Sequence, residues 1–272
     1  MSAALRPLTT GQLLDKTFQI YRQNFGVFAG ISALPHACTL LLQLCLLGVV
    51  LGPGSSGHRV GATLFVSLLM LLVSSIMSSI ALAATTFGVS DNYLEEPTTI
   101  SSCFGRAKGK ILRVIWVSFK FGMALGIGFI LLIIPGLYVA GKYGLCTPAV
   151  VLEDIDSSKA FKRSAQLTQG STGRILTIYF LVWVLILVIG VALQAVIAAA
   201  APSLAKTTGS TAATVIQYVL SALTNMLITP IQAIALTLAY YDQRVRKEAF
   251  DIESMMNLLG MGSAKGEMTP AL

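Results

Sequence analysis

The sequence predicts an all-α protein, a polytopic transmembrane helical bundle of six spans with amphipathic helices at the membrane interface. The first observation is composition: 55% of the 272 residues are hydrophobic and 11% are charged, more apolar surface than a soluble domain of this size buries. The second is a set of four stretches without Asp, Glu, Lys or Arg, each longer than the ~20 residues that cross a bilayer. The third is the distribution of Lys and Arg, which favours one side of the membrane.

The chain opens with an amphipathic segment, residues 9–25, that precedes the first span. Thr9 and Gln12 have the spacing of a capping box, which satisfies free backbone N–H groups at a helix start. The uncharged stretch that follows is long enough to cross the membrane, and a short Gly/Ser-rich connection leads to the next one. These features predict an interfacial helix followed by a membrane hairpin.

The middle of the chain is ambiguous. It holds either one span over 121–141, kinked at Pro135, or two spans that turn at Pro135 and Gly136. With two spans, fifteen Lys and Arg residues lie on the cytoplasmic side and two, Arg59 and Lys206, lie outside; with one span the division is eight against nine. Because cytoplasmic flanks accumulate positive residues, the two-span reading is preferred. Its second span is short, ~24 Å at 1.5 Å per residue. A partly re-entrant helix, or a helix surrounded by protein, would tolerate this length.

We therefore predict one transmembrane domain over residues 1–260 and a flexible cytoplasmic tail over 261–272. The expected spans are residues 26–51, 60–88, 111–134, 137–152, 175–201 and 211–241, and the expected amphipathic segments are 9–25, 99–110, 157–169 and 242–260. An amphipathic segment followed by a hairpin recurs three times, beginning near Thr9, Thr99 and Ser157. This order suggests pseudo-threefold organisation as a hypothesis.

Residue types that carry catalysis or bind metals are scarce. The four cysteines form no C-x-x-C pair, and His36 and His58 are the two histidines, so neither a zinc site nor a disulfide framework is indicated. The sequence has no H-E-x-x-H, no G-x-S-x-G and no Walker A loop. The acidic trio Glu153, Asp154 and Asp156 is expected to cap the following helix. We expect no enzyme activity and no cofactor.

Two groups of residues are the candidate functional sites. The first is a polar membrane face on the last span together with a lysine in the fourth, and its members are Gln217, Ser221, Thr224, Asn225, Gln232 and Lys142. The second is a set of cytosolic basic residues that would contact anionic lipids or partners: Arg106, Lys108, Lys110, Lys159, Lys162 and Arg163. Since the basic residues lie at span boundaries, we expect no nucleic acid partner despite the net charge of +7.

Several segments together resemble a known bacterial family. They are the opening Leu5-Arg-Pro-Leu-Thr-Thr-Gly-Gln, the turn Ile134-Pro-Gly-Leu-Tyr, the segment Pro148-Ala-Val-Val-Leu-Glu leading to Ala160-Phe-Lys-Arg-Ser, and the closing Tyr240-Tyr-Asp-Gln-Arg. They are similar to the membrane domain of glycerophosphoryl diester phosphodiesterases and its YciC-like relatives. In that family catalysis belongs to a separate soluble barrel, for which this chain has no residues, so the resemblance implies a membrane module without the catalytic part.

Together these observations predict a non-catalytic integral protein of the bacterial inner membrane, with both termini cytoplasmic, that organises partner proteins or lipids. The alternative is a membrane subunit of a transporter or exporter for an anionic or amphipathic solute, which would need a separate ATPase as partner because no Walker A loop is present. The expected partners are membrane lipids and other membrane proteins.

Overall fold

The structure is a computed structural model that describes residues 8–52, 56–93 and 97–258, and in these residues the regular elements are all α-helices. The helices are α1 (Thr10–Gln23), α2 (Phe25–Leu51), α3 (Ser56–Tyr93), α4 (Ile100–Lys108), α5 (Ile111–Leu131), α6 (Ile133–Tyr143), α7 (Cys146–Glu153), α8 (Ser157–Thr168), α9 (Thr172–Thr208) and α10 (Ser210–Leu258). The predicted all-α bundle is confirmed.

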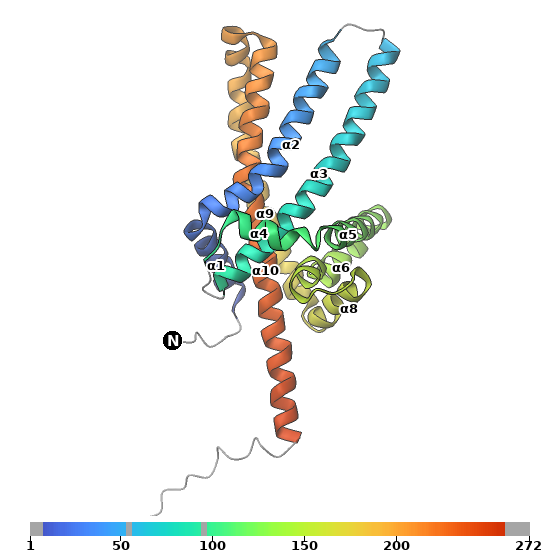
Figure 1. Ribbon diagram of the computed structural model, residues 1–272, viewed down its shortest axis with the longest axis vertical. Helices are drawn as coiled ribbons and strands as arrows, with labels where there is room; N and C mark the ends of the chain where they lie inside the picture. Colours follow the sequence, from blue (N-terminus) through green and yellow to red (C-terminus); the bar gives the residue numbers. More distant parts are fainter. Residues whose placement is uncertain (1–7, 53–55, 94–96, 259–272) are drawn as a thin grey trace, which may run out of the picture.

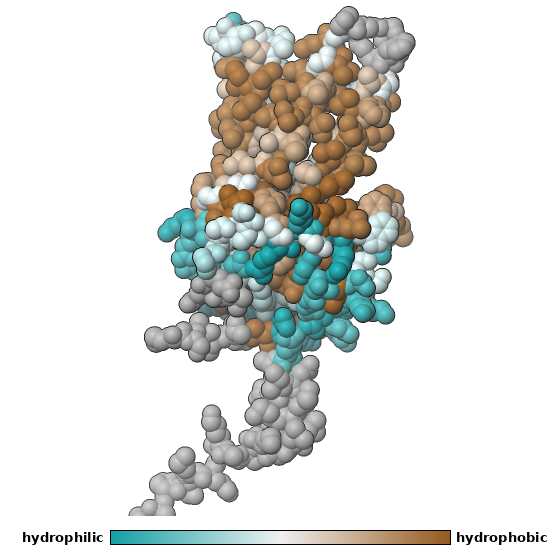
Figure 2. All heavy atoms as spheres, viewed as in Figure 1, coloured by the Kyte–Doolittle hydropathy of each residue, from teal (hydrophilic) through white to brown (hydrophobic). Residues whose placement is uncertain are grey.

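Two long hairpins, α2–α3 and α9–α10, rise to the same side of the molecule (Figure 1). Within each hairpin the two helices pack together, and α10 also packs on α2. The short helices α1, α4, α7 and α8 gather at the opposite end, which we call the base. The surface of the long hairpins is apolar and the surface at the base is polar (Figure 2). This separation is typical of a membrane protein with one solvated end.

Among the described residues, five helices are long and apolar enough to cross a membrane, and they match five of the six predicted spans. They are α2, residues 60–93 of α3, α5, α9 and residues 210–248 of α10. The helices α3 and α9 run beyond the predicted spans by several residues. The chain is therefore a membrane-embedded helical protein.

A single helix over residues 137–152, the predicted fourth span, is not what the structure shows, and that part of the prediction is wrong. The segment forms α6, of 11 residues, and α7, of 8 residues, which are separated at Gly144 and Leu145. The first six residues of α7 are all buried. An apolar run of this length can lie in the interior of a polar domain as well as in lipid, and here half of it fills the interior of the base.

The predicted turn at Pro135 and Gly136 is displaced by three residues. The chain turns at Leu132, which has extended backbone angles and separates α5 from α6. Pro135 lies in the first turn of α6, where its missing N–H costs no hydrogen bond. A Cβ atom built on Gly128 would lie 2.9 Å from the Cα atom of Gly136, so the two glycines allow α5 and α6 to approach closely.

The buried core lies at the base and not between the outer parts of the spans. It combines residues of α1, α4, α7 and α8 with the base-proximal ends of the long helices, among them Phe28, Ala84, Val117, Ile178 and Tyr240. Farther from the base, large apolar side chains such as Leu68 and Val191 are about two-thirds exposed. Lipid covers such surfaces in a membrane, so the outer parts of the hairpins need no core of their own.

One of the two predicted helix caps forms as expected, and the other lacks its side-chain hydrogen bond. Thr9 and Gln12 form the predicted capping box of α1, and Thr99 forms a second one with Ser102 at the start of α4. Asp156 is the N-cap residue of α8, although its side chain makes no capping hydrogen bond. The predicted separate helix over 242–260 is instead a continuation of α10 up to Leu258. The predicted tail, residues 261–272, lies outside the described residues.

The order of elements follows the three predicted units. An amphipathic helix precedes each pair of helices: α1 before α2–α3, α4 before α5–α6, and α8 before α9–α10. The middle unit differs, because α6 is short and is followed by the buried helix α7. The pseudo-threefold organisation stays a hypothesis.

Candidate functional site

Asp242 on α10 is the centre of an ion cluster that holds the start of the described chain. Its carboxylate is fully buried and accepts hydrogen bonds from the Leu8 backbone N–H at 2.7 Å and from Arg246 at 3.0 Å. Arg174 of α9 lies 3.0 Å from the same carboxylate. Both guanidinium groups also donate to the Leu8 carbonyl oxygen. One buried carboxylate therefore ties the segment before α1 to α9 and α10.

Glu153 is the centre of a second cluster, which joins α7, α8 and α10. The Nε atom of Arg163 lies 2.8 Å and 3.0 Å from the two carboxylate oxygens of Glu153, and Tyr240 donates its hydroxyl to the same group. Arg163 also pairs with Glu248, which pairs in turn with Arg244. Burial opposes the charged guanidinium, but the two carboxylates outweigh it and raise the pKa of Arg163 above its ordinary value.

Two further carboxylates hold α4 and α5 against their neighbours. Asp91, buried near the end of α3, pairs with Arg106 of α4, whose guanidinium also lies 4.5 Å from the centre of the Phe87 ring. Asp154, just after α7, lies 3.3 Å from the Lys110 ammonium and 2.8 Å from the Arg113 guanidinium. Lys110 also donates to the Val151 carbonyl oxygen. These contacts fix the path of the chain between the first hairpin and the base.

The Asp154 contact predicts a small acid-dependent loss of stability. The pKa of Asp154 lies below its ordinary value of 3.8, mainly because of the Lys110 ammonium and to a smaller extent because of the Arg113 guanidinium. A carboxyl group whose pKa is lower in the folded state than in the unfolded state stabilises the fold at pH values above its unfolded-state pKa. This stabilisation is lost as the pH falls through the folded-state pKa. Unfolding measured from pH 6 to pH 3 should show a smaller acid-induced loss for Asp154→Asn than for the wild type. An identical pH profile in both proteins would contradict this assignment.

The predicted basic sites therefore divide into two kinds. Arg106, Lys110 and Arg163 are held in ion pairs within the fold. Lys108, Lys159 and Lys162 are exposed, and none has an ion-pair or hydrogen-bond partner among the residues that the structure describes. Lys108 lies on α4, and the other two lie on α8, one helical turn apart. These three ammonium groups are the free cations of the predicted set, and we call them the free lysines.

The predicted polar face of α10 is divided between two neighbouring helices. Ser221 donates to the Gln194 side chain of α9 at 3.1 Å, while Thr224 on the same side of α10 is buried. Toward α2, the His36 ring nitrogen Nε2 lies 3.0 Å from the Thr229 hydroxyl. Polar side chains on this face thus join α10 to α9 and to α2, as interhelical hydrogen bonds do in membranes.

The other members of that predicted site do not join these contacts. The Asn225 side chain donates to the backbone of its own helix, at Ser221. Gln217 and Gln232 have no hydrogen-bond partner among the described residues, and Gln232 is exposed. Lys142 lies on α6, where it donates to the Tyr138 hydroxyl at 3.1 Å, and its carbonyl oxygen accepts from Ser164 and Thr168 of α8. The structure therefore separates Lys142 from the face of α10.

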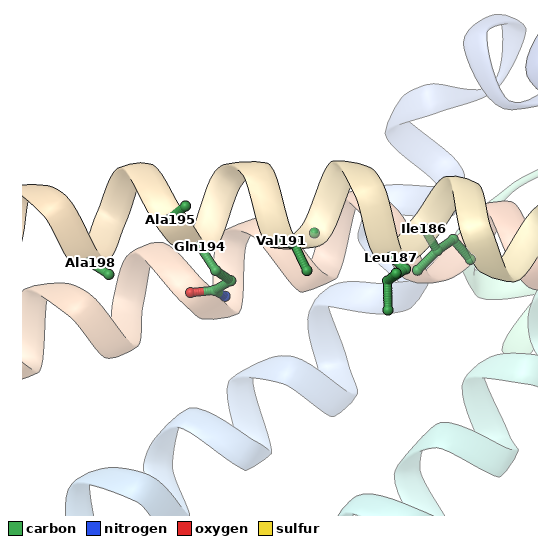
Figure 3. Close-up of a pocket in the computed structure, with 7 residues that line it drawn as sticks. Ile186, Leu187, Val191, Gln194, Ala195 and Ala198 are labelled. Carbon is green, nitrogen blue, oxygen red and sulfur yellow. The ribbon is translucent and has the colours of Figure 1, made fainter.

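A shallow apolar groove of about 510 Å³ runs along α9 (Figure 3). It is lined by Ile186, Leu187, Gly190, Val191, Gln194, Ala195 and Ala198. Gln194, its one polar side chain with hydrogen-bonding groups, reaches toward α10 and the Ser221 hydroxyl. Such a groove suits an acyl chain or another apolar group.

No metal or thiol chemistry is evident in the part of the chain that the structure describes. No three His, Cys, Asp or Glu side chains there come close enough to share a metal ion. Cys103 and Cys146 are buried, and burial raises the pKa of the Cys146 thiol to about 12. Both cysteines lie in the hydrophobic core, and the Cys146 thiol stays protonated and unreactive at neutral pH.

Comparison with known proteins places the chain in a family. Residues 99–243, which are 145 of the 272, match the model of a domain of unknown function (DUF7847). The chain belongs to this family. The matched segment begins at the cap of α4 and ends after Asp242. It contains Glu153, Arg163 and Tyr240 of the second cluster, but not Glu248. It also excludes Leu8 and Asp91. No curated protein and no solved structure matches the chain.

Sequence patterns alone do not single out the carboxylates that organise the base. Asp91 and Asp242 were not selected, and Glu153 was interpreted as part of a helix cap. A usable signal was their position: each lies at the base end of an apolar helix, where a carboxylate has basic span flanks as neighbours. What the sequence could not provide was the pairing of residues more than 60 positions apart, such as Arg174 with Asp242.

Proposed function

We propose that this chain is a non-catalytic integral protein of the bacterial inner membrane that organises anionic lipids or partner proteins at its cytoplasmic face through the base. The proposed orientation follows the positive-inside tendency, since most Lys and Arg residues lie at or near the base. We also propose that the chain is related to the membrane domain of glycerophosphoryl diester phosphodiesterases, which it resembles in sequence. It is supported by the meeting of the opening and closing motifs at Leu8 and Asp242.

The observation that carries the proposal is the set of free lysines. Structural ion pairs use Arg106, Lys110 and Arg163, whereas Lys108, Lys159 and Lys162 remain exposed on α4 and α8. A Lys near an anionic membrane surface contributes about 1 kcal/mol to the attraction. Three such groups on short helices beside the apolar spans suit phosphate headgroups or acidic segments of a partner.

The first test replaces each free lysine separately with glutamine. The binding of phosphatidylglycerol and of phosphatidylcholine to the protein is measured by native mass spectrometry in a mild detergent. Each variant should lose phosphatidylglycerol affinity by about fivefold, which corresponds to about 1 kcal/mol, with phosphatidylcholine unchanged. The matched Lys→Arg variants keep the charge and should bind as the wild type does. Glutamine variants with full affinity for phosphatidylglycerol would contradict the lipid form of the proposal.

A second candidate, a membrane subunit of a transporter or exporter for an anionic or amphipathic solute, is favoured by the groove on α9 (Figure 3). Mass spectrometry after mild extraction should then recover an amphipathic molecule, a separate ATPase or both. Val191→Trp fills the groove and should displace the molecule, whereas Leu68→Trp, on the exposed side of α3, should not. Equal recovery from both variants would argue against the groove as a binding site.

A further inference from the structure

The tip of the α5–α6 hairpin is an exposed apolar segment near the base. From Phe129 to Ile134 every side chain is hydrophobic and between 45% and 85% exposed. The Phe129 ring packs beside Gly136 of α6, and the five side chains that follow it are at least 65% exposed. Their exposure needs an apolar partner, since a patch of this kind in water is an aggregation hazard.

As a whole α5 is long and apolar enough to cross a membrane, but the part of the hairpin that extends beyond the base is too short to do so. Lys120, halfway along α5, donates to the Ser157 hydroxyl at the start of α8, so the first half of α5 belongs to the base. Beyond it remain residues 121–131 of α5 and the 11 residues of α6. Each leg therefore extends ~16 Å, against ~30 Å of hydrocarbon. Figure 1 agrees, because α5 and α6 remain near the level of the base and do not follow the long hairpins outward.

Both legs carry lysine and aromatic side chains of the type found at lipid headgroups. On α5 the Lys120 ammonium lies 5.2 Å from the Trp116 ring centre, and Trp116 stacks on Phe119. On α6 the Lys142 ammonium lies 5.1 Å from the Tyr138 ring and 5.5 Å from the Tyr143 ring. Aromatic rings and lysines with long apolar stems collect at the membrane interface. We call these six residues the collar.

The backbone of the turn is suited to an apolar environment. The Leu132 N–H donates to the Gly128 carbonyl oxygen at 3.1 Å, and the Gly136 N–H donates to the Leu132 carbonyl oxygen at 3.4 Å. Pro135 has no N–H that would need a partner. Backbone polar groups in hydrocarbon must be satisfied within the protein, and a turn with few free donors meets that condition better than an open loop.

We propose that the α5–α6 hairpin enters only the leaflet next to the base, with phospholipid acyl chains around its tip and headgroups at the collar. Figure 2 supports this occupant, because the apolar surface of the long hairpins continues to the region of α5. The inference deepens the proposed function, since a hairpin in one leaflet acts on the packing of that leaflet alone. Its orientation toward the cytoplasm rests on that proposed function.

The test uses tryptophan fluorescence in proteoliposomes. The two native tryptophans, Trp116 and Trp183, are replaced with phenylalanine, and Leu132→Trp places a single reporter at the exposed tip. Acyl-chain-brominated phospholipid should quench this reporter strongly, and aqueous iodide, present on both sides of the membrane, should not. Two matched reporters define the limits: Leu68→Trp in the middle of α3 as a lipid-exposed site and Lys206→Trp at the far end of α9 as a water-exposed turn.

Other outcomes overturn the proposal. Iodide quenching like that of the Lys206→Trp reporter would place the turn in water, on the far side of the membrane or in the cytosol. Absence of quenching by either agent would mean that protein, such as a second copy, covers the tip. The native Trp116, observed alone after Trp183→Phe, provides a second measurement without altering the hairpin, and as a collar residue at headgroup depth it should be quenched by acyl-chain-brominated lipid more weakly than the tip reporter. Protease access to the base from each side tests the cytoplasmic orientation separately, so failure of either idea can be recognised.

Discussion

Asp242→Asn should lower the free energy of unfolding by about 3 kcal/mol, because it leaves two guanidinium groups facing each other without a counter-charge. The Asp242 side chain is fully buried, and Arg174 is only 21% exposed. The Arg246 side chain is 35% exposed, so its guanidinium can be hydrated in the variant. We therefore expect a loss at the lower end of the ~3–5 kcal/mol that removal of one partner from a buried ion pair costs. The loss is measured by unfolding of the purified protein in detergent.

A local measurement separates this mechanism from general destabilisation. The Leu8 N–H donates to Asp242, so its hydrogen exchange should accelerate in the variant before the spans unfold. Asp15→Asn removes an exposed carboxylate from α1 and is the matched control, with an expected change below about 0.5 kcal/mol. Equal stability of the two variants would show that the Asp242 cluster does not hold the base together.

Gly144→Ala should destabilise the protein by about 3 kcal/mol through overpacking between α6 and α9. A Cβ atom on Gly144 would lie 2.3 Å from Cε2 of Tyr179 and 2.6 Å from the Ala140 carbonyl oxygen. Tyr179 cannot move away freely, since its hydroxyl donates to the Gly144 carbonyl oxygen at 2.8 Å. The same backbone site is where α6 ends and α7 begins, so the strain would act on the junction itself.

The control for this prediction is another glycine close by. A Cβ atom on Gly173, near the start of α9, meets no atom within 4 Å, so Gly173→Ala should be neutral or stabilise by up to about 1 kcal/mol. In a Tyr179→Leu background the additional cost of Gly144→Ala should be smaller than in the wild type, because the shorter side chain leaves room for the methyl group. If Gly144→Ala unfolds like Gly173→Ala, close packing at this junction is not required for stability.

Local sequence signals predicted the helices well where they were strong. The uncharged stretches became α2, α3, α9 and most of α10, and Thr9 with Gln12 formed the capping box at the start of α1. These features depend on neighbours within one or two helical turns, or on the length of an apolar run, and both can be read along the chain.

Local sequence signals do not predict the depth to which the middle hairpin, α5–α6, enters the membrane. The distribution of Lys and Arg distinguishes an even number of membrane crossings from an odd number. A hairpin that enters the membrane and returns has both ends on the same side, as a pair of crossing helices does. The count therefore favoured two spans over one, but it does not distinguish a crossing pair from the short α5–α6 hairpin. The proposal of a hairpin in one leaflet rests instead on tertiary contacts, among them the hydrogen bond from Lys120 to Ser157 at the start of α8.

The candidate sites were predictable as residue types but not as partners. That the six basic residues contact lipids or partners stays a prediction. The structure shows that Arg106, Lys110 and Arg163 pair with carboxylates, while the other three have no partner among the described residues. By itself the sequence determined a membrane-embedded helical protein with a basic, polar end, because hydropathy and charge are properties of each segment. Tertiary structure decided that α7 is core and not span, and which charges are available to a partner. Both depend on which distant segments meet, as Leu8 meets Asp242 across 234 positions of the chain.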